Sequence, residues 1–181
     1  MNVVLGSASP RRRDLLQQLG LEFEVIAPEI DESPLQGEAP VAYVLRLAEA
    51  KSAAIEAPAD ALVITADTTV DLDGEILGKP VDAAEAAAML RRLSARTHRV
   101  HTGVALRRGD RLVSEVTTSL VTFTPLTAEA IDWYIATGEP LDKAGAYAVQ
   151  GAGGVFVQRV MGSVSSVVGL PLHTVMRLAG E

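Results

Sequence analysis

The sequence predicts a mixed α/β fold, and three patterns support this prediction. The apolar runs at 2–6 and 61–67 are short and nearly continuous, which is typical of strands covered on both faces. The segment 40–56 has apolar residues at helical spacing, whereas 98–107 alternates apolar and polar residues. The 181 residues contain no internal repeat and no linker-like stretch, so we expect one domain over 1–181, built around a mixed sheet.

The chain begins with a predicted strand-to-helix unit. NVVLG at 2–6 is the strand, Ser9 is a suitable N-cap, and Pro10 suits the first position of a helix whose leucines continue toward Gly20. Three consecutive arginines, 11–13, follow at once. Because a helix N-terminus favours anions, Ser9 and these guanidinium groups could cradle a polyphosphate. A capped surface helix with solvated arginines also explains the same residues.

The next two elements bring in an acid and a lysine. A second short strand, FEVIAP at 23–28, leads into an acidic loop that contains Glu32. In the helix predicted at 40–56, Lys51 lies on the same apolar stripe as Val44. A lysine on the inward face of a helix either extends its ammonium back to solvent or reaches into a site.

The predicted strand at 61–67 ends on Asp67. The carboxyl end of a buried strand is where α/β sheets usually bind ligands, so Asp67 with Thr68 could hold a divalent metal or orient a water. An aspartate there could also simply cap the next turn. Glu32 is the natural second carboxylate, because Mg²⁺ or Mn²⁺ in phosphate chemistry is commonly held by one or two carboxylates and by the substrate.

The second half of the chain predicts hairpins flanked by helices. The pairs Asp73–Gly74 and Gly109–Asp110 predict the turns. The Gly-rich segment 145–169, which includes GAGG, lacks the helix of a dinucleotide-binding fold and should hold tight turns, loops and short strands. The other predicted elements are a helix from Asp82 to about Leu93, strands at 98–107 and 112–124, a helix from Thr127 to Thr137 with Trp133 and Tyr134 in the core, and a last helix from Pro171 to near Gly180.

Composition argues against several functional classes. The net charge of −7 argues against non-specific binding to nucleic acid or to an anionic membrane. No apolar run is long enough to span a bilayer, the N-terminus lacks the pattern of a signal peptide, and there is no cysteine for a disulfide or a thiolate site. We therefore expect a soluble cytoplasmic α/β domain that binds neither nucleic acid nor a membrane. A homodimer is left open as its assembly state.

Other residues give weaker signals. Lysine supplies only 3 of the 16 basic residues, so Lys79 and Lys143 attract attention, although a solvated loop lysine is the simpler explanation. His98 and His101 are three residues apart on a predicted strand and so face opposite sides, which makes them a poor metal pair. The Walker A pattern G-x-x-x-x-G-K-[ST] is absent from the chain.

Eight segments together resemble the Maf family of nucleotide pyrophosphatases. The resemblance runs almost end to end and keeps the order and spacing of the family pattern. The segments are LGSASPRRRDLL, EIDES, LRLAEAKS, ITADTTV, GEILGKP, THRVHTGVAL, EPLDKAGAYAVQG and VVGLPL.

The resemblance implies a fold and an activity. Family members have an elongated mixed-sheet fold with two lobes and a central cleft, similar to the inosine triphosphate pyrophosphatases. They hydrolyse a nucleoside triphosphate between the α and β phosphates with a divalent metal, Mg²⁺ or Mn²⁺, and so clean the nucleotide pool. One branch resembles dTTP/UTP pyrophosphatases and carries A-D-T and G-A-Y-x-x-Q-G. This chain has A-D-T at 66–68 and G-A-Y at 145–147 with Gln150, which is similar to that branch.

The resemblance also implies the site residues. Asp67 matches the catalytic proton acceptor, and Glu32 would bind the metal with it. Arg11, Thr68 and Gln150 match positions linked to substrate choice. The other matched cleft residues are Ser9, Arg12, Lys51 and Lys79, of which the two lysines would act in catalysis.

Two alternatives stay open at this stage. The same chemistry could act on purine or modified nucleotides such as 7-methyl-GTP, the substrate of another branch. The chain could instead be a non-catalytic nucleotide-binding regulator, because the family has a reputed link to septum formation. Departures from the family pattern are few: Gly6 stands where alanine is usual, Ala95 where glycine is common, and Val164 where an aromatic is common. Arg13 matches no cleft role, and we expect it to face solvent.

Overall fold

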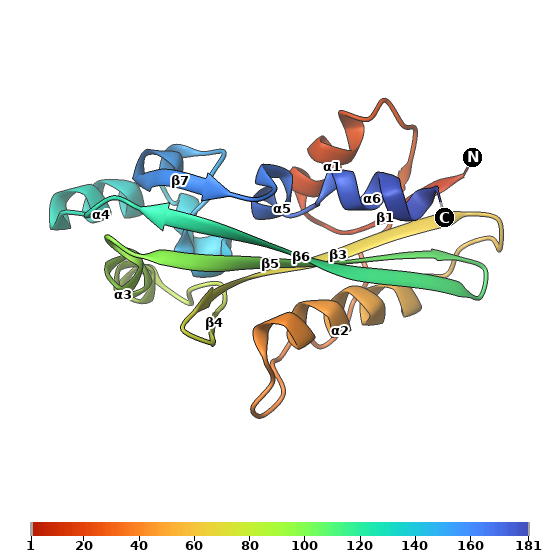
Figure 1. The fold of residues 1–181 in the computed structure, drawn as a ribbon, viewed down its shortest axis with the longest axis horizontal. Helices are drawn as coiled ribbons and strands as arrows, with labels where there is room; N and C mark the ends of the chain where they lie inside the picture. Colours follow the sequence, from red (N-terminus) through yellow and green to blue (C-terminus); the bar gives the residue numbers. More distant parts are fainter. Residues whose placement is uncertain (1, 181) are drawn as a thin grey trace.

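Seven strands in one mixed sheet form the centre of the computed structural model, which describes residues 2–180 (Figure 1). They are β1 (Val3–Gly6), β2 (Glu24–Val25), β3 (Leu62–Leu72), β4 (Glu75–Leu77), β5 (Thr97–Arg108), β6 (Arg111–Phe123) and β7 (Val157–Met161). The sheet order is β2-β1-β3-β5-β6-β7, with β4 paired to β3. Strand β1 is parallel to β2 and β3, and the other pairs are antiparallel. The predicted mixed sheet is therefore confirmed.

Helices cover both faces of this sheet. The α-helices of residues 2–180 are α1 (Pro10–Gln17), α2 (Pro40–Ala53), α3 (Ala83–Leu93), α4 (Ala128–Ala136), α5 (Val164–Val168) and α6 (Leu172–Ala179). Three short 3-10 helices are η1 (Glu139–Asp142), η2 (Ala144–Ala146) and η3 (Ala152–Phe156). Helix α2 lies on one face, below the sheet in Figure 1, and α5 and α6 lie on the other. None of these helices has the length and apolar character that crossing a bilayer requires.

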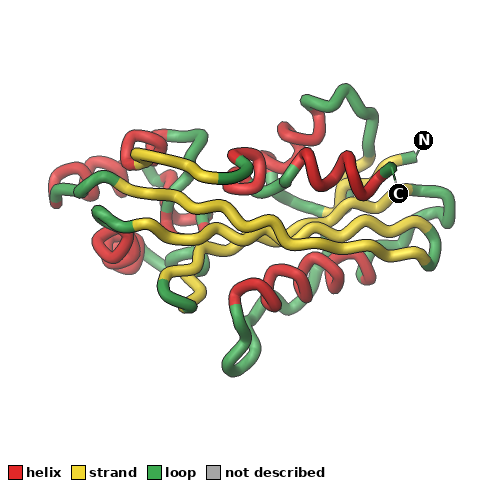
Figure 2. The backbone as a smooth tube through the Cα atoms, in the orientation of Figure 1, coloured by secondary structure: helices red, strands yellow, loops and turns green. Residues whose placement is uncertain are grey.

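Buried apolar side chains gather at the two ends of the long sheet. The strands β3, β5 and β6 run along the molecule and give it an elongated shape (Figure 2). One cluster includes Leu90 and Phe123 and lies at the end that carries α3 and α4. A second includes Leu5 and Leu16 and lies at the end that carries α1 and α6. These two packed ends agree with the two lobes that the family resemblance implies.

Several local predictions are confirmed. Asp73 (φ 58°) and Gly74 (φ 89°) form a two-residue turn between β3 and β4, and a type I′ hairpin requires positive φ at both positions. Asp82 caps α3, because its carboxylate accepts a hydrogen bond from the backbone N–H of Glu85 at 2.8 Å. Arg13 is exposed on α1, as expected for the one arginine of the cluster without a matched cleft role.

Four local predictions are wrong. The strand expected at 23–28 shrinks to the two residues of β2. Trp133 is 50% exposed while Tyr134 is fully buried, because neighbouring residues of a helix point about 100° apart and only one can face the core. The segment 145–169 contains α5 and two 3-10 helices beside β7, not only loops and strands. Ser9 stands at the N-cap position of α1, but its side chain accepts no capping hydrogen bond.

Gly103 on β5 lets helix α2 approach the sheet closely. A Cβ at this position would lie 2.4 Å from the carbonyl oxygen of Val44 on α2. A hydrogen bond also links α2 to β3, because the hydroxyl of Thr65 donates to the carbonyl oxygen of Ala48 at 2.7 Å. Gly103 pairs with Asp67 across the β3–β5 ladder. The close approach therefore holds α2 next to the strand residue that carries this carboxylate.

A methyl group at this position should destabilise the protein. Because helix backbone occupies the space, we expect Gly103→Ala to lower the free energy of unfolding by about 1–3 kcal/mol. Urea unfolding would measure the loss. The matched control is Gly78→Ala, where a Cβ would meet no atom within 4 Å and the midpoint should barely change. Equal midpoints for the two variants would contradict the close approach of α2.

Candidate functional site

One edge of β3 is open in the middle of the strand. Its ladder with β1 ends at Thr65, and its ladder with β4 begins at Val70. Within the described part of the chain, residues 66–69 therefore pair with β5 alone. The prediction that this strand ends on Asp67 is wrong, because β3 continues past the end of β1 to Leu72 and stays paired with β5 as far as Asp71. Asp67 thus lies in a gap along the sheet edge.

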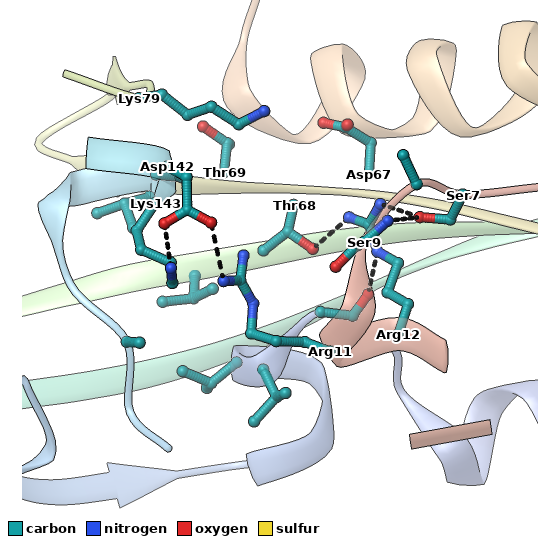
Figure 3. A pocket seen from close by; sticks show the side chains of 18 of the residues that line it. Ser7, Ser9, Arg11, Arg12, Asp67, Thr68, Thr69, Lys79, Asp142 and Lys143 are labelled. Atoms are coloured by element: carbon teal, nitrogen blue, oxygen red, sulfur yellow. Dashed lines mark hydrogen bonds and ion pairs between the residues drawn. The ribbon is translucent and has the colours of Figure 1, made fainter. Parts of the chain in front are cut away.

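A cleft of about 460 Å³ opens at this gap. Its lining includes Asp67, Thr68 and Thr69 of β3. Because successive side chains of a strand point to opposite faces, the cleft reaches both faces of the sheet. Asp67 and Thr69 point to the same side as Lys79, whereas Thr68 points the other way, toward Arg12 (Figure 3). The cleft is lined by all nine site residues expected from the sequence, which are Ser9, Arg11, Arg12, Glu32, Lys51, Asp67, Thr68, Lys79 and Gln150.

Lys51 holds two acidic residues together. Its Nζ lies 2.7 Å from Oδ1 of Asp67 and 2.7 Å from Oε1 of Glu32. The lysine side chain is only 8% exposed, so the prediction that Lys51 faces inward is confirmed. The two carboxylates come from distant parts of the chain, one from β3 and one from the loop before α2, and Lys51 joins them from α2.

The surroundings separate the proton affinities of these carboxylates. Burial raises the pKa of Asp67 above its ordinary value, although the charges of Lys51 and Arg12 act against this. Burial also opposes the charged form of Glu32, but the hydrogen bond and charge of Lys51, with the charge of Lys79, outweigh it and lower the pKa of Glu32. One carboxylate is therefore a stronger base than usual, and the other stays charged.

On the opposite side of β3, Arg12 is fixed by three hydrogen bonds. It donates from Nε to the carbonyl oxygen of Gly169 at 2.8 Å, from Nη1 to Oγ of Ser7 at 3.3 Å, and from Nη2 to Oγ1 of Thr68 at 3.2 Å. Burial lowers the pKa of Arg12, and the charge of Asp67 acts against this. An arginine tied at all three nitrogens needs little reordering to meet an anion.

The hydroxyl of Thr68 has only one hydrogen-bonding position left. Its Oγ1 accepts from Arg12 and lies 2.9 Å from Oγ1 of Thr102. The single proton of Thr102 is donated to the carbonyl oxygen of Ser166 at 2.8 Å. Thr68 must therefore be the donor to Thr102, and its remaining position is an acceptor lone pair.

Arg11 and Lys143 meet an acid on the far wall of the cleft. Nη1 of Arg11 lies 3.6 Å from Oδ2 of Asp142, and Nζ of Lys143 contacts Oδ1 of the same residue. The cleft lining includes five basic and three acidic side chains, so its local charge is positive although the chain carries −7. A polyanion would be attracted to this region of an otherwise acidic protein.

Two residues of the site were missed by sequence reasoning. The hydroxyl of Tyr43 donates to the carbonyl oxygen of Glu32 at 3.0 Å and so fixes the acidic loop. Its place on α2, about two turns before Lys51, is a signal that could have identified it. Asp142 lies in the segment EPLDKAGAYAVQG, directly before Lys143, but no local pattern indicates its contact with Arg11, which forms only in the tertiary fold.

Among the described residues that line the cleft there is no histidine, and its carboxylates are the charged candidate ligands for a metal. Within residues 2–180, no group of three or more histidines, aspartates and glutamates is arranged to hold a metal. Glu32 and Asp67 converge on Lys51 as a pair. Two carboxylates suit a hard cation such as Mg²⁺ that takes its remaining oxygen ligands from phosphates and water.

Comparisons with known proteins cover nearly the whole chain. A family profile described as Maf-like protein matches residues 2–181. The chain belongs to this family. A protein named dTTP/UTP pyrophosphatase from Anaeromyxobacter dehalogenans is 55% identical over 175 residues, which cover 94% of this chain and 88% of the relative. A protein of the same name from Myxococcus xanthus is 55% identical over 177 residues, which cover 97% and 90%.

Among solved structures, this Maf-like protein is similar to the Ham1 protein of Staphylococcus aureus, with a TM-score of 0.49 and 14% identity over 93% of this chain and 84% of that chain. All eight resembling segments contribute residues to the lining of the cleft. LGSASPRRRDLL supplies Ser9, Arg11 and Arg12. LRLAEAKS supplies Lys51, and GEILGKP supplies Lys79. THRVHTGVAL supplies Val100 to the lining and also supports the cleft through the contacts of Thr102 and Gly103.

Removal of the lysine should change the titration of Asp67. Since the charge and hydrogen bond of Lys51 act to lower the pKa of this aspartate, we expect Lys51→Met to raise it further. Carbon-13 NMR of the aspartate carboxyl groups would measure the midpoint. Lys79→Met is the matched control, because Lys79 lowers the pKa of Glu32 and should leave Asp67 nearly unchanged. An Asp67 midpoint that stays constant or falls in Lys51→Met would contradict this interaction.

Proposed function

We propose that this Maf-like protein, acting as one domain over 1–181, hydrolyses dTTP and UTP between the α and β phosphates, giving the monophosphate and pyrophosphate. The observation that carries the proposal is the Lys51 bridge between Asp67 and Glu32, inside a cleft whose other basic residues can bind phosphates. Relatives named dTTP/UTP pyrophosphatase, 55% identical over most of the chain, support it.

Asp67 is the group best suited to accept a proton. Lys51 holds its Oδ1, whereas its Oδ2 accepts no hydrogen bond from any residue in the described range. Burial raises the pKa of this carboxylate, which makes it a stronger base than an exposed aspartate. In the proposed step, water attacks the α-phosphorus, Asp67 takes the water's proton, and the bond from the α-phosphorus to the bridging oxygen breaks. Pyrophosphate leaves with the electron pair of that bond.

Glu32 and Asp67 would hold a divalent cation, Mg²⁺ or Mn²⁺, together with the substrate phosphates. Such a cation supplies charge neutralisation of the phosphates and of the leaving group. Lys51 keeps the two carboxylates at one place, with 2.7 Å contacts to each, so that the donors are already together before the nucleotide arrives. The low pKa of Glu32 keeps this ligand charged at neutral pH.

The basic residues would bind the triphosphate from both sides of β3. Arg12 lies on one side, where three hydrogen bonds fix it, and Lys79 lies on the other (Figure 3). Arg11 and Ser9 add a guanidinium and the N-terminus of α1. Charges held in place before the reaction usually provide the largest part of catalysis in phosphoryl transfer.

Thr68 and Gln150 support the choice of thymine and uracil. Thr68 has only acceptor capacity left, which matches the ring N–H that both bases present and that neutral cytosine lacks. The amide of Gln150 offers both a donor and an acceptor and is exposed at the cleft. A site that pairs such groups rejects a base that leaves them unpaired.

Replacement of the general base Asp67 should greatly slow catalysis, while nucleotide binding persists. We expect Asp67→Asn to lower the rate of pyrophosphate release from dTTP by at least about 100-fold, because an amide cannot take the proton. Calorimetry should still detect nucleotide binding. Asp73→Asn, an equal change at the exposed hairpin turn, is the matched control and should keep the wild-type rate.

The outcomes separate the competing functions. Pyrophosphate release near the wild-type rate in Asp67→Asn would contradict the role of this residue. A substrate panel that showed preference for 7-methyl-GTP or ITP would contradict the choice of pyrimidines. Nucleotide binding by the wild-type protein without pyrophosphate release, in either Mg²⁺ or Mn²⁺, would indicate a binding protein in place of an enzyme.

A further inference from the structure

An acidic residue outside the catalytic cluster holds the loop that carries Gln150. Glu139, the first residue of η1, accepts three hydrogen bonds through its carboxylate. The donors are the hydroxyl of Tyr134 at 2.7 Å, the backbone N–H of Ala152 at 2.9 Å and the backbone N–H of Gly153 at 3.1 Å. Glu139 opens the segment EPLDKAGAYAVQG, but the family resemblance gave it no role and the proposed catalytic steps do not use its carboxylate.

Tyr134 ties the same loop on its other side. Its hydroxyl oxygen accepts a hydrogen bond from the backbone N–H of Ala148 at 3.1 Å while donating to Glu139. Tyr134 belongs to α4 and is fully buried, so the position of its ring is fixed by packing. The segment 148–153 is therefore held at both ends by one carboxylate and one phenol, with Gln150 between the two points of attachment.

The glycines of the GAGG sequence fit this arrangement. A Cβ at Gly151 would lie 2.2 Å from Oε2 of Glu139, and a Cβ at Gly153 would lie 2.6 Å from the hydroxyl oxygen of Tyr134. Burial opposes the charged form of Glu139, but the hydrogen bonds from Tyr134 and the loop N–H groups outweigh it and lower its pKa. The loop thus has glycine where the charged carboxylate and the phenol come closest.

The position of Gln150 depends on this backbone. Its side chain makes no hydrogen bond to any residue between 2 and 180, so nothing else in the structure orients it. We propose that Glu139 and Tyr134 form a clasp that sets the position of Gln150 and are thereby positioning residues for recognition of the base. This inference rests on the proposed function, since it concerns the choice among nucleotides at that same site.

Weakening the clasp should reduce discrimination between bases. We expect Glu139→Gln and Tyr134→Phe each to lower the ratio of kcat/KM for dTTP to kcat/KM for dCTP by about tenfold. A displaced amide of Gln150 would no longer pair selectively with thymine, so cytosine would be rejected less strongly. The ratio of the dissociation constant for dCTP to that for dTTP should fall in parallel. Glu129→Gln, which removes an exposed charge on α4, is the matched control and should leave both ratios unchanged.

A double-mutant cycle with Gln150→Ala distinguishes positioning from general loosening. If the clasp acts through Gln150, adding Glu139→Gln to Gln150→Ala should cause no further loss of discrimination. Unchanged ratios in both single variants would overturn the proposal, and so would an equal loss in the presence and absence of Gln150. Thermal unfolding checks that each variant folds, and Tyr134→Phe carries the test if Glu139→Gln does not fold.

Failure of this inference differs from failure of the proposed function. If the wild-type protein released no pyrophosphate from any nucleotide, the proposed function would fail. The ratio of the dissociation constants for dCTP and dTTP, measured in the same double-mutant cycle, would then still test the clasp.

Discussion

The contact of Lys51 with Asp67 and Glu32 is the interaction on which the rest of the site depends. Placing an ammonium and a carboxylate where each is at most a tenth exposed is costly unless they pair. The pairing requires α2 to lie against β5, which Gly103 permits, and requires β3 to extend past the end of β1. The fold thus brings together three charges from three segments that are distant in sequence.

The gap in the edge of β3 explains how one strand can serve two chemical tasks. Side chains that alternate along 66–69 reach opposite faces, and each face has its own partners. Asp67 meets Lys51 under α2, where protons and a cation would be handled. Thr68 meets Arg12 beside α5, where phosphate and base would be bound. A strand paired on both edges along 66–69 would have closed the gap at which the cleft opens.

The sequence predicted the charged groups of the site better than their surroundings. Lys51 was recognisable as a lysine on an apolar helical stripe, and Arg12 as a cation at a helix N-terminus, because both are local patterns. Asp67 is indicated both by the family resemblance and by an expected strand end, and only the second ground is wrong, since the strand continues beyond Asp67 and the gap lies between the ladders with β1 and β4. Asp142 and Glu139 both lie in the segment EPLDKAGAYAVQG, but their roles could not be predicted, because the contacts that define these roles form only in the fold.

The position of bond cleavage tests the proposed chemistry most directly. Hydrolysis of dTTP in water enriched in a heavy oxygen isotope, followed by mass spectrometry of the products, shows which phosphorus the water attacks. Attack at the α-phosphorus, with Asp67 as base, places the label in the monophosphate and leaves the pyrophosphate unlabelled. Label in pyrophosphate or in orthophosphate would contradict the assignment of the cleft to pyrophosphate release.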